Sequence, residues 1–131
     1  QMSLCIMDLD HFKRINDEHG HDVGDAVLRH VAQQLSCSLR HSDVVGRFGG
    51  EEFVLVLPDT GLEQAVAVLN RLREDLAATP VPVNGQLLRV SATFGVTEVQ
   101  EGDAELEDIL KRADRALYEG KGAGRNRVMT A

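Results

Sequence analysis

The sequence of 131 residues predicts a single α+β domain in which helices pack against a mixed β-sheet. Apolar segments of strand length alternate with amphipathic segments of helix length, in the order β-α-α-β-β-α-β-α-β. Apolar residues make up 43% of the chain and charged residues 27%, which is typical of a globular protein with its own core. The βααββ start of this order favours a ferredoxin-like arrangement with flanking helices.

The first half of the chain contains a strand and two helices. Residues 2–7 form an apolar run typical of a buried strand, and Asp10 is the expected N-cap of a short helix over residues 11–19. Gly20 ends that helix. Apolar residues at four-residue spacing then predict a longer helix from residue 22 to about residues 41–43.

Strand-like runs over residues 44–48 and 51–57 meet at Gly49-Gly50, a pair that can take positive φ in a tight hairpin turn. Pro80 and Pro82 interrupt the chain after a further helix. The second half is expected to contain a helix over residues 61–78, a strand over 87–99, a helix over 106–118, a flexible turn at Gly120, Gly122 and Gly124, and a short strand over 127–129.

Charge and composition exclude several classes of protein. Fourteen Lys and Arg against twenty-one Asp and Glu give a net charge of −7, so we expect no nucleic-acid partner. No apolar run approaches the roughly 20 residues of a membrane helix, and no signal peptide is recognisable, so we expect a cytoplasmic domain without membrane contact of its own. Two cysteines without C-x-x-C spacing argue against a disulfide framework or a structural zinc site.

Acidic residues follow the first strand and the double glycine. Asp8 and Asp10 end the strand, and Glu51 and Glu52 follow the turn. If the hairpin pairs with the first strand, Asp8 and Glu51 converge, and two adjacent carboxylates favour a bound cation. Mg²⁺ suits such a site because proteins hold it with one or two carboxylates and substrate phosphates. The alternative is that these acids are solvated charges at strand ends.

Other polar residues match parts of a nucleotide. A carboxylate can accept from both N1–H and the exocyclic amine of guanine, so Asp25, with Asn16, favours guanine over adenine. Lys121 and Arg125 lie in a glycine-rich stretch whose backbone can approach phosphates. The structural alternatives are that Asp25 stabilises the first turn of a helix, Asn16 is a cap, and the basic pair is solvated.

Four motifs occur in order along nearly the whole chain. They are DLDHFKRIND at residues 8–17, GHDVGD at 20–25, RFGGEEF at 47–53, and ADRALY at 113–118 followed by Lys121 and by GRNR at 124–127. Together they resemble the GGDEF family of diguanylate cyclases, with the signature in its GGEEF form. The resemblance implies a fold of the nucleotidyl-cyclase palm type and the condensation of two GTP molecules into cyclic di-GMP, with release of two pyrophosphates.

The resemblance also implies roles for individual residues. Asp8, Glu51 and the Leu9 carbonyl resemble ligands of Mg²⁺, with two ions expected per site and Mn²⁺ as an alternative. Glu52 is the candidate to assist deprotonation of the attacking 3′-hydroxyl, although metal binding could itself lower the hydroxyl pKa. The residues that resemble substrate-binding groups are Asn16 and Asp25 for guanine, Lys13, Lys121 and Arg125 for phosphates, and Phe12, His21, Gly49 and Gly50 around the nucleotide.

Arg40 and Asp43 form an R-x-x-D sequence that matches the family's inhibitory site for the dinucleotide product. Arginine can bond phosphate or a guanine edge, and aspartate can accept from N1–H. The alternative is an i,i+3 salt bridge at a helix end. Arg71 is the candidate for a further arginine of the product site, with Arg73 as its rival. Because one domain holds one GTP, the resemblance also implies a two-fold homodimer.

The start of the chain departs from the family pattern. A D-x-L-T-G-L-x-N-R-type stretch usually precedes the first strand, so residues 1–131 are expected to be one GGDEF domain trimmed at its N-terminus, from a parent protein that could be membrane-anchored elsewhere. Two other functions stay open: an inactive module that senses GTP or cyclic di-GMP, and a different nucleotidyl transferase with a polymerase-like palm. The intact acidic signature argues against the first, and Asp25 with the R-x-x-D sequence argues against the second.

Overall fold

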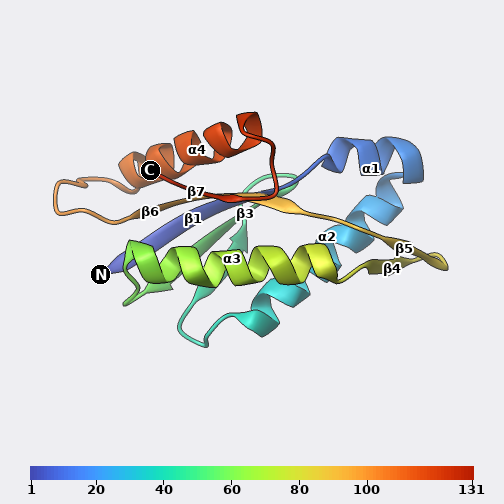
Figure 1. Ribbon diagram of the computed structural model, residues 1–131, viewed down its shortest axis with the longest axis horizontal. Helices are drawn as coiled ribbons and strands as arrows, with labels where there is room; N and C mark the ends of the chain where they lie inside the picture. The colour runs from blue at the N-terminus through green and yellow to red at the C-terminus, as the bar shows by residue number, and fades with distance from the viewer.

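The computed structural model describes all 131 residues, and its elements follow the predicted order with one added strand pair (Figure 1). A five-stranded sheet has the order β2-β3-β1-β6-β7, and β4 and β5 form a separate two-stranded sheet. None of the helices is long and apolar enough to cross a membrane. The elements are β1 (Met2–Leu9), α1 (Phe12–His19), α2 (His21–Ser38), β2 (Val44–Arg47), β3 (Glu52–Pro58), α3 (Leu62–Ala78), β4 (Val81–Val83), β5 (Gln86–Leu88), β6 (Ala92–Glu98), α4 (Leu106–Gly122) and β7 (Val128–Thr130).

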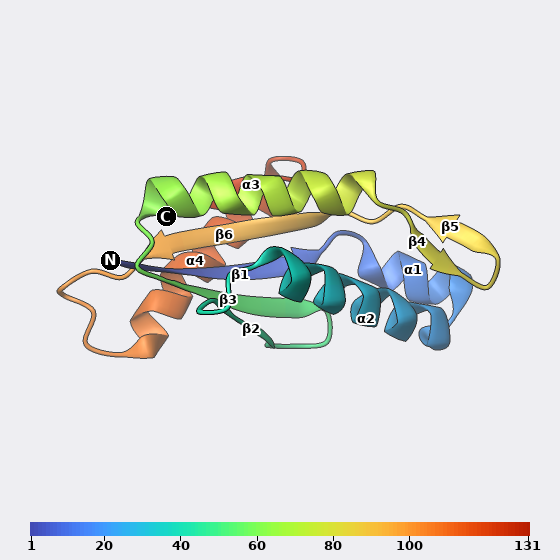
Figure 2. The ribbon, with the colours of Figure 1, turned by 90° about the horizontal axis from the view of Figure 1, so that it is seen from below.

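The large sheet confirms the predicted mixed, ferredoxin-like architecture. Strand β1 pairs antiparallel with both β3 and β6, and β2 pairs antiparallel with β3. Strand β7 adds a parallel pairing at the edge beside β6. Helices α2 and α3 cover one face of this sheet, and α4 covers the other, as Figure 2 shows with α4 behind the strands. This three-layer arrangement buries both faces of β1.

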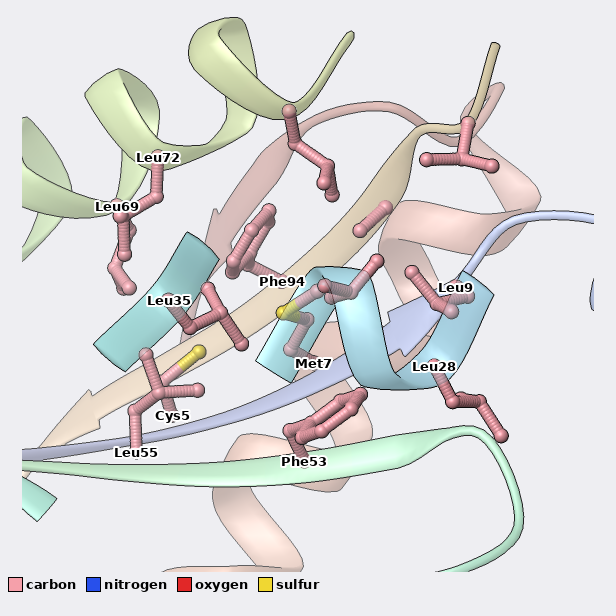
Figure 3. Packing of buried hydrophobic residues seen from close by; sticks show 14 of the residues in the cluster. Cys5, Met7, Leu9, Leu28, Leu35, Phe53, Leu55, Leu69, Leu72 and Phe94 are labelled. Atoms are coloured by element: carbon pink, nitrogen blue, oxygen red, sulfur yellow. The ribbon is translucent and has the colours of Figure 1, made fainter. Parts of the chain in front are cut away.

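The alternation of side chains along β1 supplies both cores. Cys5, Met7 and Leu9 belong to the larger cluster with α2 and α3, whereas Leu4 and Ile6 pack with α4. Figure 3 shows the larger cluster, in which Met7 and Leu9 lie among apolar side chains from β3, β6 and α2. Since β1 is buried on both faces, its carboxyl end and the polar residues that follow are held in a fixed place.

Two predictions about the first helices are wrong. His11, not Asp10, occupies the N-cap position of α1, with φ of 55° and no side-chain capping bond. The carboxylate of Asp10 is instead used by hydrogen bonds to β6 and to the turn before β7. Helix α2 ends at Ser38, several residues before the predicted end, because Leu39 already adopts an extended conformation.

The turn chemistry of the two hairpins also differs from expectation. Gly49 and Gly50 do not have positive φ. They lie in a four-residue connection in which the amides of Phe48 and Gly49 both donate to the Glu52 carbonyl. The predicted strand over residues 87–99 is divided into β5 and β6, and β4 was not predicted. Asn84 and Gly85, at φ of 47° and 76°, form the two-residue turn that joins β4 to β5.

Helix α4 continues past its predicted end at Tyr118 as far as Gly122, so the expected flexible turn begins later. Gly120 is buried, and a Cβ there would lie 2.7 Å from the Thr93 methyl group, which means that tight packing on β6 requires glycine at this position. The turn itself contains positive φ at Gly124, Arg125 and Asn126. The last strand is displaced by one residue from the predicted range.

Candidate active site

The end of β1 meets the start of β3, where the sequence predicts a shared site. Asp8 lies directly opposite Glu52 in the antiparallel register. The amide of Leu9 donates to the carbonyl oxygen of Glu51, across 3.3 Å. The Asp8 carboxylate is close enough to Glu51 to help raise the pKa of the Glu51 carboxyl group. The fold therefore brings together the two acids that the sequence analysis paired.

Charge at this position is unbalanced. Burial and the neighbouring Asp8 carboxylate raise the pKa of Glu51, and the same two causes raise the pKa of Glu52. Lys121 opposes both shifts, with its Nζ 2.5 Å from Oδ2 of Asp8. Three carboxylates thus share one nearby ammonium group, and the cluster attracts further positive charge.

The donor set fits a hard divalent cation. Asp8 and Glu51 offer carboxylate oxygens, and Leu9 offers a backbone carbonyl, which are ligand types that Mg²⁺ prefers. No group of three or more His, Cys, Asp or Glu side chains is arranged to hold a metal by itself. A cation bound here would complete its shell with water or phosphate oxygens, as Mg²⁺ commonly does.

A cavity of about 600 Å³ opens beside these acids. Cations from three different segments line it, namely the start of α1, the end of α4 and the turn before β7. The predicted site residues that the cavity brings together are Asp8, Leu9, Phe12, Lys13, Glu51, Lys121 and Arg125. Paired with the carboxylates, the cationic side chains suit an anionic ligand that carries a metal ion.

The candidate guanine-binding residues lie outside this cavity. Asn16 on α1 faces α2, where its Oδ1 occupies the space that a side chain at Gly24 would need. That oxygen is buried and has no hydrogen-bond partner. The adjacent Asp25 lines a second cavity of about 340 Å³ with Leu28 and Arg47. The structure therefore places the two residues on facing helices, with Asp25 at the second cavity and the Asn16 oxygen buried outside it.

Besides Asn16, three further predicted substrate residues line neither cavity. His21 is exposed at the start of α2, and Gly49 and Gly50 are exposed in the hairpin connection. Glu52 also lies outside both cavities.

The R-x-x-D residues lie at the other end of β1. Arg40 bonds Asp43 at 3.0 Å, and its guanidinium also donates to the Pro58 carbonyl and to Thr60 Oγ1, each at 2.8 Å. The salt bridge considered for this pair is therefore present, within a larger network. Arg71 on α3 is exposed and takes no part in it. These bonds leave Arg40 accessible, since 57% of its side chain is exposed.

The rival arginine has other partners. Arg73 bonds Asn70, Glu74 and Asn126, which ties α3 to the turn before β7.

Sequence reasoning missed the role of Asp10. Its carboxylate accepts hydrogen bonds from Ser91, Thr93 and the backbone of Asn126. The available signal was the placement of Ser91 and Thr93 at alternate positions of an otherwise apolar strand, which marks one face for a polar partner.

Residues 1–127 match the family model described as "Diguanylate cyclase, GGDEF domain". The chain belongs to the GGDEF family. Its similarity to diguanylate cyclase DgcP of Pseudomonas aeruginosa is 47% identity over 128 residues, which cover 98% of this chain and 19% of that protein. The chain therefore spans about a fifth of the length of this curated relative.

Solved GGDEF structures have the same fold. The active GGEEF domain of a diguanylate cyclase from Vibrio cholerae superposes with a TM-score of 0.90 at 36% identity, covering 98% of this chain and 81% of that one. The GGDEF domain of DgcB from Caulobacter crescentus, in complex with c-di-GMP, gives a TM-score of 0.92 at 31% identity, covering 98% and 77%. The predicted family and the predicted mixed α+β fold are both confirmed.

Proposed function

We propose that this GGDEF domain is the catalytic part of a diguanylate cyclase that condenses two GTP molecules into cyclic di-GMP. The observation that carries the proposal is the convergence of Asp8 and Glu51 beside a cavity lined by Lys13, Lys121 and Arg125. Relatives named as diguanylate cyclases support it, as does the relative crystallised with c-di-GMP.

The acidic and the basic side chains have different roles in binding a nucleoside triphosphate: the acids hold a metal ion, and the cations bind the phosphates. Asp8, Glu51 and the Leu9 carbonyl would hold Mg²⁺, which supplies charge neutralisation and lowers the pKa of a hydroxyl when bound. Lys13, Lys121 and Arg125 line the cavity and supply positive charge to the triphosphate. Positioning and charge neutralisation provide most of the acceleration in phosphoryl transfer.

In the proposed reaction the 3′-oxygen of one GTP bonds to the α-phosphorus of the other. The bond from that phosphorus to the bridging oxygen breaks, and pyrophosphate leaves. The hydroxyl proton passes to a base, for which Glu52 is our candidate. Burial and Asp8 raise the pKa of Glu52, which makes its carboxylate a better proton acceptor than an ordinary glutamate.

Guanine selectivity is assigned to Asn16 and Asp25. Asp25 can accept from both N1–H and the exocyclic amine, a pair that adenine does not present. The buried, unpartnered Oδ1 of Asn16 adds a further acceptor on the facing helix.

A second copy of the domain must supply the second GTP, because each domain has one cavity with this set of acids and cations. Two cavities facing one another across a two-fold axis let each nucleotide attack the other. We further propose that Arg40 and Asp43, with Arg71, bind the product and inhibit turnover. In that role the dinucleotide would bond Nη1 of Arg40, which takes no part in the bonds to Asp43, Pro58 and Thr60.

The function is tested with the 131-residue chain fused to a dimeric coiled coil and incubated with GTP and Mg²⁺. Chromatography should detect cyclic di-GMP, with two pyrophosphates per product, and ATP should give no dinucleotide. Binding of GTP without product would indicate a sensor module instead. Equal turnover of ATP would indicate a different nucleotidyl transferase.

The product site is tested by Arg40→Ala in the same fusion. Turnover at low product should stay near that of the unmodified chain, and inhibition by added cyclic di-GMP should weaken. Arg115→Ala, which removes an exposed arginine of α4 outside every candidate site, is the control. Inhibition that persists unchanged in Arg40→Ala would return Arg40 to a purely structural salt bridge.

A further inference from the structure

Asp10 is a buried carboxylate that the proposed chemistry does not use. It lies two residues after Asp8 and is 7% exposed. Its Oδ1 accepts from the hydroxyl of Thr93 at 2.6 Å, and its Oδ2 accepts from the hydroxyl of Ser91 at 2.6 Å and from the amide of Asn126 at 3.0 Å. Three segments of the chain therefore meet at one carboxylate: the end of β1, the start of β6 and the turn before β7.

The turn before β7, which Asp10 bonds, contains an unfavourable backbone conformation at two residues. Arg125 and Asn126 both have positive φ, at 62° and 46°, a region that side-chain-bearing residues rarely adopt. The amide of Asn126 points at Oδ2 of Asp10 and also lies 3.2 Å from Oγ1 of Thr93. Bonds from a backbone amide to a carboxylate are stronger than neutral ones, so Asp10 stabilises this conformation.

The same turn carries part of the candidate phosphate site. Arg125 lines the 600 Å³ cavity, and its amide donates to the carbonyl of Gly120 in the last turn of α4, next to Lys121. Asp10 does not line that cavity and has no bond to either cation. The link between Asp10 and these two cations therefore runs through the turn, by way of the Asn126 amide.

We propose that Asp10 is a positioning residue for the triphosphate-binding half of the site. By fixing the turn against the end of β1, it sets where Arg125 lies and, through the end of α4, where Lys121 meets Asp8. It therefore controls affinity for the phosphates and not for the base, whose candidate contacts Asn16 and Asp25 come from α1 and α2. This inference rests on the proposed function only in taking GTP as the ligand.

A matched control lies near the other end of α4. Asp103 precedes α4, and its side chain is 5% exposed. It accepts from Arg112 at 2.9 Å and from the Gln100 amide at 2.7 Å. Asp10 and Asp103 thus have comparable networks near opposite ends of α4, but only Asp10 bonds the turn that carries Arg125.

The experiment measures dissociation constants of the whole 131-residue chain for GTP and for guanosine, both with Mg²⁺, in Asp10→Asn and in Asp103→Asn. Asp10→Asn should raise the Kd for GTP by about 10-fold, the scale of losing an outer partner of a binding group, and leave the Kd for guanosine within about twofold. Asp103→Asn should lower thermal stability and leave the ratio of the two constants unchanged, as a merely structural role requires.

Ser91→Ala is the second variant if Asp10→Asn does not fold, since it removes one donor to Oδ2 and nothing from the core. Ser91→Ala should raise the Kd for GTP relative to that for guanosine by about threefold, less than Asp10→Asn, because only one of the hydrogen bonds to Asp10 is lost. Equal weakening of GTP and guanosine, or unchanged GTP binding in a folded variant, would overturn the inference. Failure of the unmodified chain to bind either ligand would instead count against the proposed function.

Discussion

Two clusters of charged side chains lie at opposite ends of the β1–β6 pair, and they differ in how completely their charges are matched. Asp8 pairs in register with Thr93, whereas Glu98, beside the other cluster, pairs with Ser3. At the Glu98 end, the hydrogen bonds of Arg112 and of the Gln100 amide lower the pKa of Asp103 to about 2.

The guanidinium of Arg112 has partners on every side. It donates to Asp103, to Oγ1 of Thr97 and to the carbonyl of Glu98. At the Asp8 end the pKa values of Glu51 and Glu52 are raised, and Lys121 alone opposes three carboxylates. The matched cluster stabilises the loop before α4, whereas the unmatched one is completed only by charge from outside the chain. Such an unmatched group beside a cavity is typical of a functional site.

The sharpest test of this difference is Glu51→Gln, which should separate activity from stability. Loss of this proposed metal ligand should remove several kcal/mol of charge stabilisation, so turnover of the dimerised domain should fall by about 100-fold or more. Without divalent cations the same variant should melt at the same temperature or about 1–3 °C higher, because one repelling carboxylate is gone and the group is largely solvent-screened.

Glu101→Gln, at an exposed position in the loop before α4, is the matched control and should change neither quantity. A fall in melting temperature in Glu51→Gln would contradict the view that its charge is unmatched.

The opposite pattern is expected for Asp103→Asn. The substitution leaves Arg112 without its anionic partner, so the melting temperature should fall by several degrees. Turnover per folded molecule should stay near that of the unmodified chain, since this cluster lies at the far end of β1. Calorimetry and an assay below the melting transition measure the two effects. A large loss of turnover in the folded variant would show that the clusters are coupled.

A divalent cation should stabilise only the unmatched cluster. At about ten times its Kd, Mg²⁺ adds roughly 1.4 kcal/mol, which corresponds to a rise of about 3–5 °C in melting temperature for a domain of this size. The shift should be retained in Asp103→Asn and lost in Glu51→Gln. An equal shift in all three proteins would indicate binding elsewhere.

The smallest expected effect is a difference in pH dependence. The folded pKa of Asp103 is about 2, below its ordinary 3.8, so its stabilising contribution is full above about pH 4 and is lost as pH falls towards 2. The folded pKa of Glu51 is above its ordinary 4.5, so its ionised form costs stability at neutral pH. That cost disappears as pH falls through the raised pKa towards 4.5.

When melting temperature is measured at decreasing pH, the values for Glu51→Gln and Asp103→Asn should each approach that of the unmodified chain, but at different pH. Glu51→Gln should lose its advantage in the window just above 4.5, and Asp103→Asn should lose its deficit only between about 4 and 2. Convergence in the reverse order would refute the assignment of matched and unmatched charge.

The sequence was sufficient to predict the order of the elements and the meeting of Asp8 with Glu51. Both depend on local signals, namely the alternation of apolar residues and the double glycine between two strand-like runs. The β4–β5 hairpin was missed because Pro80 and Pro82 were interpreted as helix breakers and not as part of a strand. The signal for its turn was the Asn84-Gly85 pair.

Other features arise only from packing between distant segments. Gly120 lies within α4 because, without a side chain, it lets the helix pack closely against Thr93. Asp10 does not cap α1 because its carboxylate accepts hydrogen bonds from Ser91 and Thr93. No pattern within one element contains that information. The part of the site most dependent on such contacts, the turn at Arg125, is therefore the part that sequence reasoning describes least well.

Gly95 has a consequence for both charged clusters. A side chain at Gly95 would clash with the backbone of α4 at Ala113 and Leu117. The backbones of α4 and β6 are therefore in direct contact at this point. Arg112 lies one residue before Ala113 in α4, and Lys121 lies eight residues after it, about 12 Å further along the helix axis. Because Gly95 lies between the two clusters along α4, a tilt of the helix about this contact would move both ends. A substitution that shifts α4 at one cluster is therefore expected to affect the other cluster through the contact at Gly95.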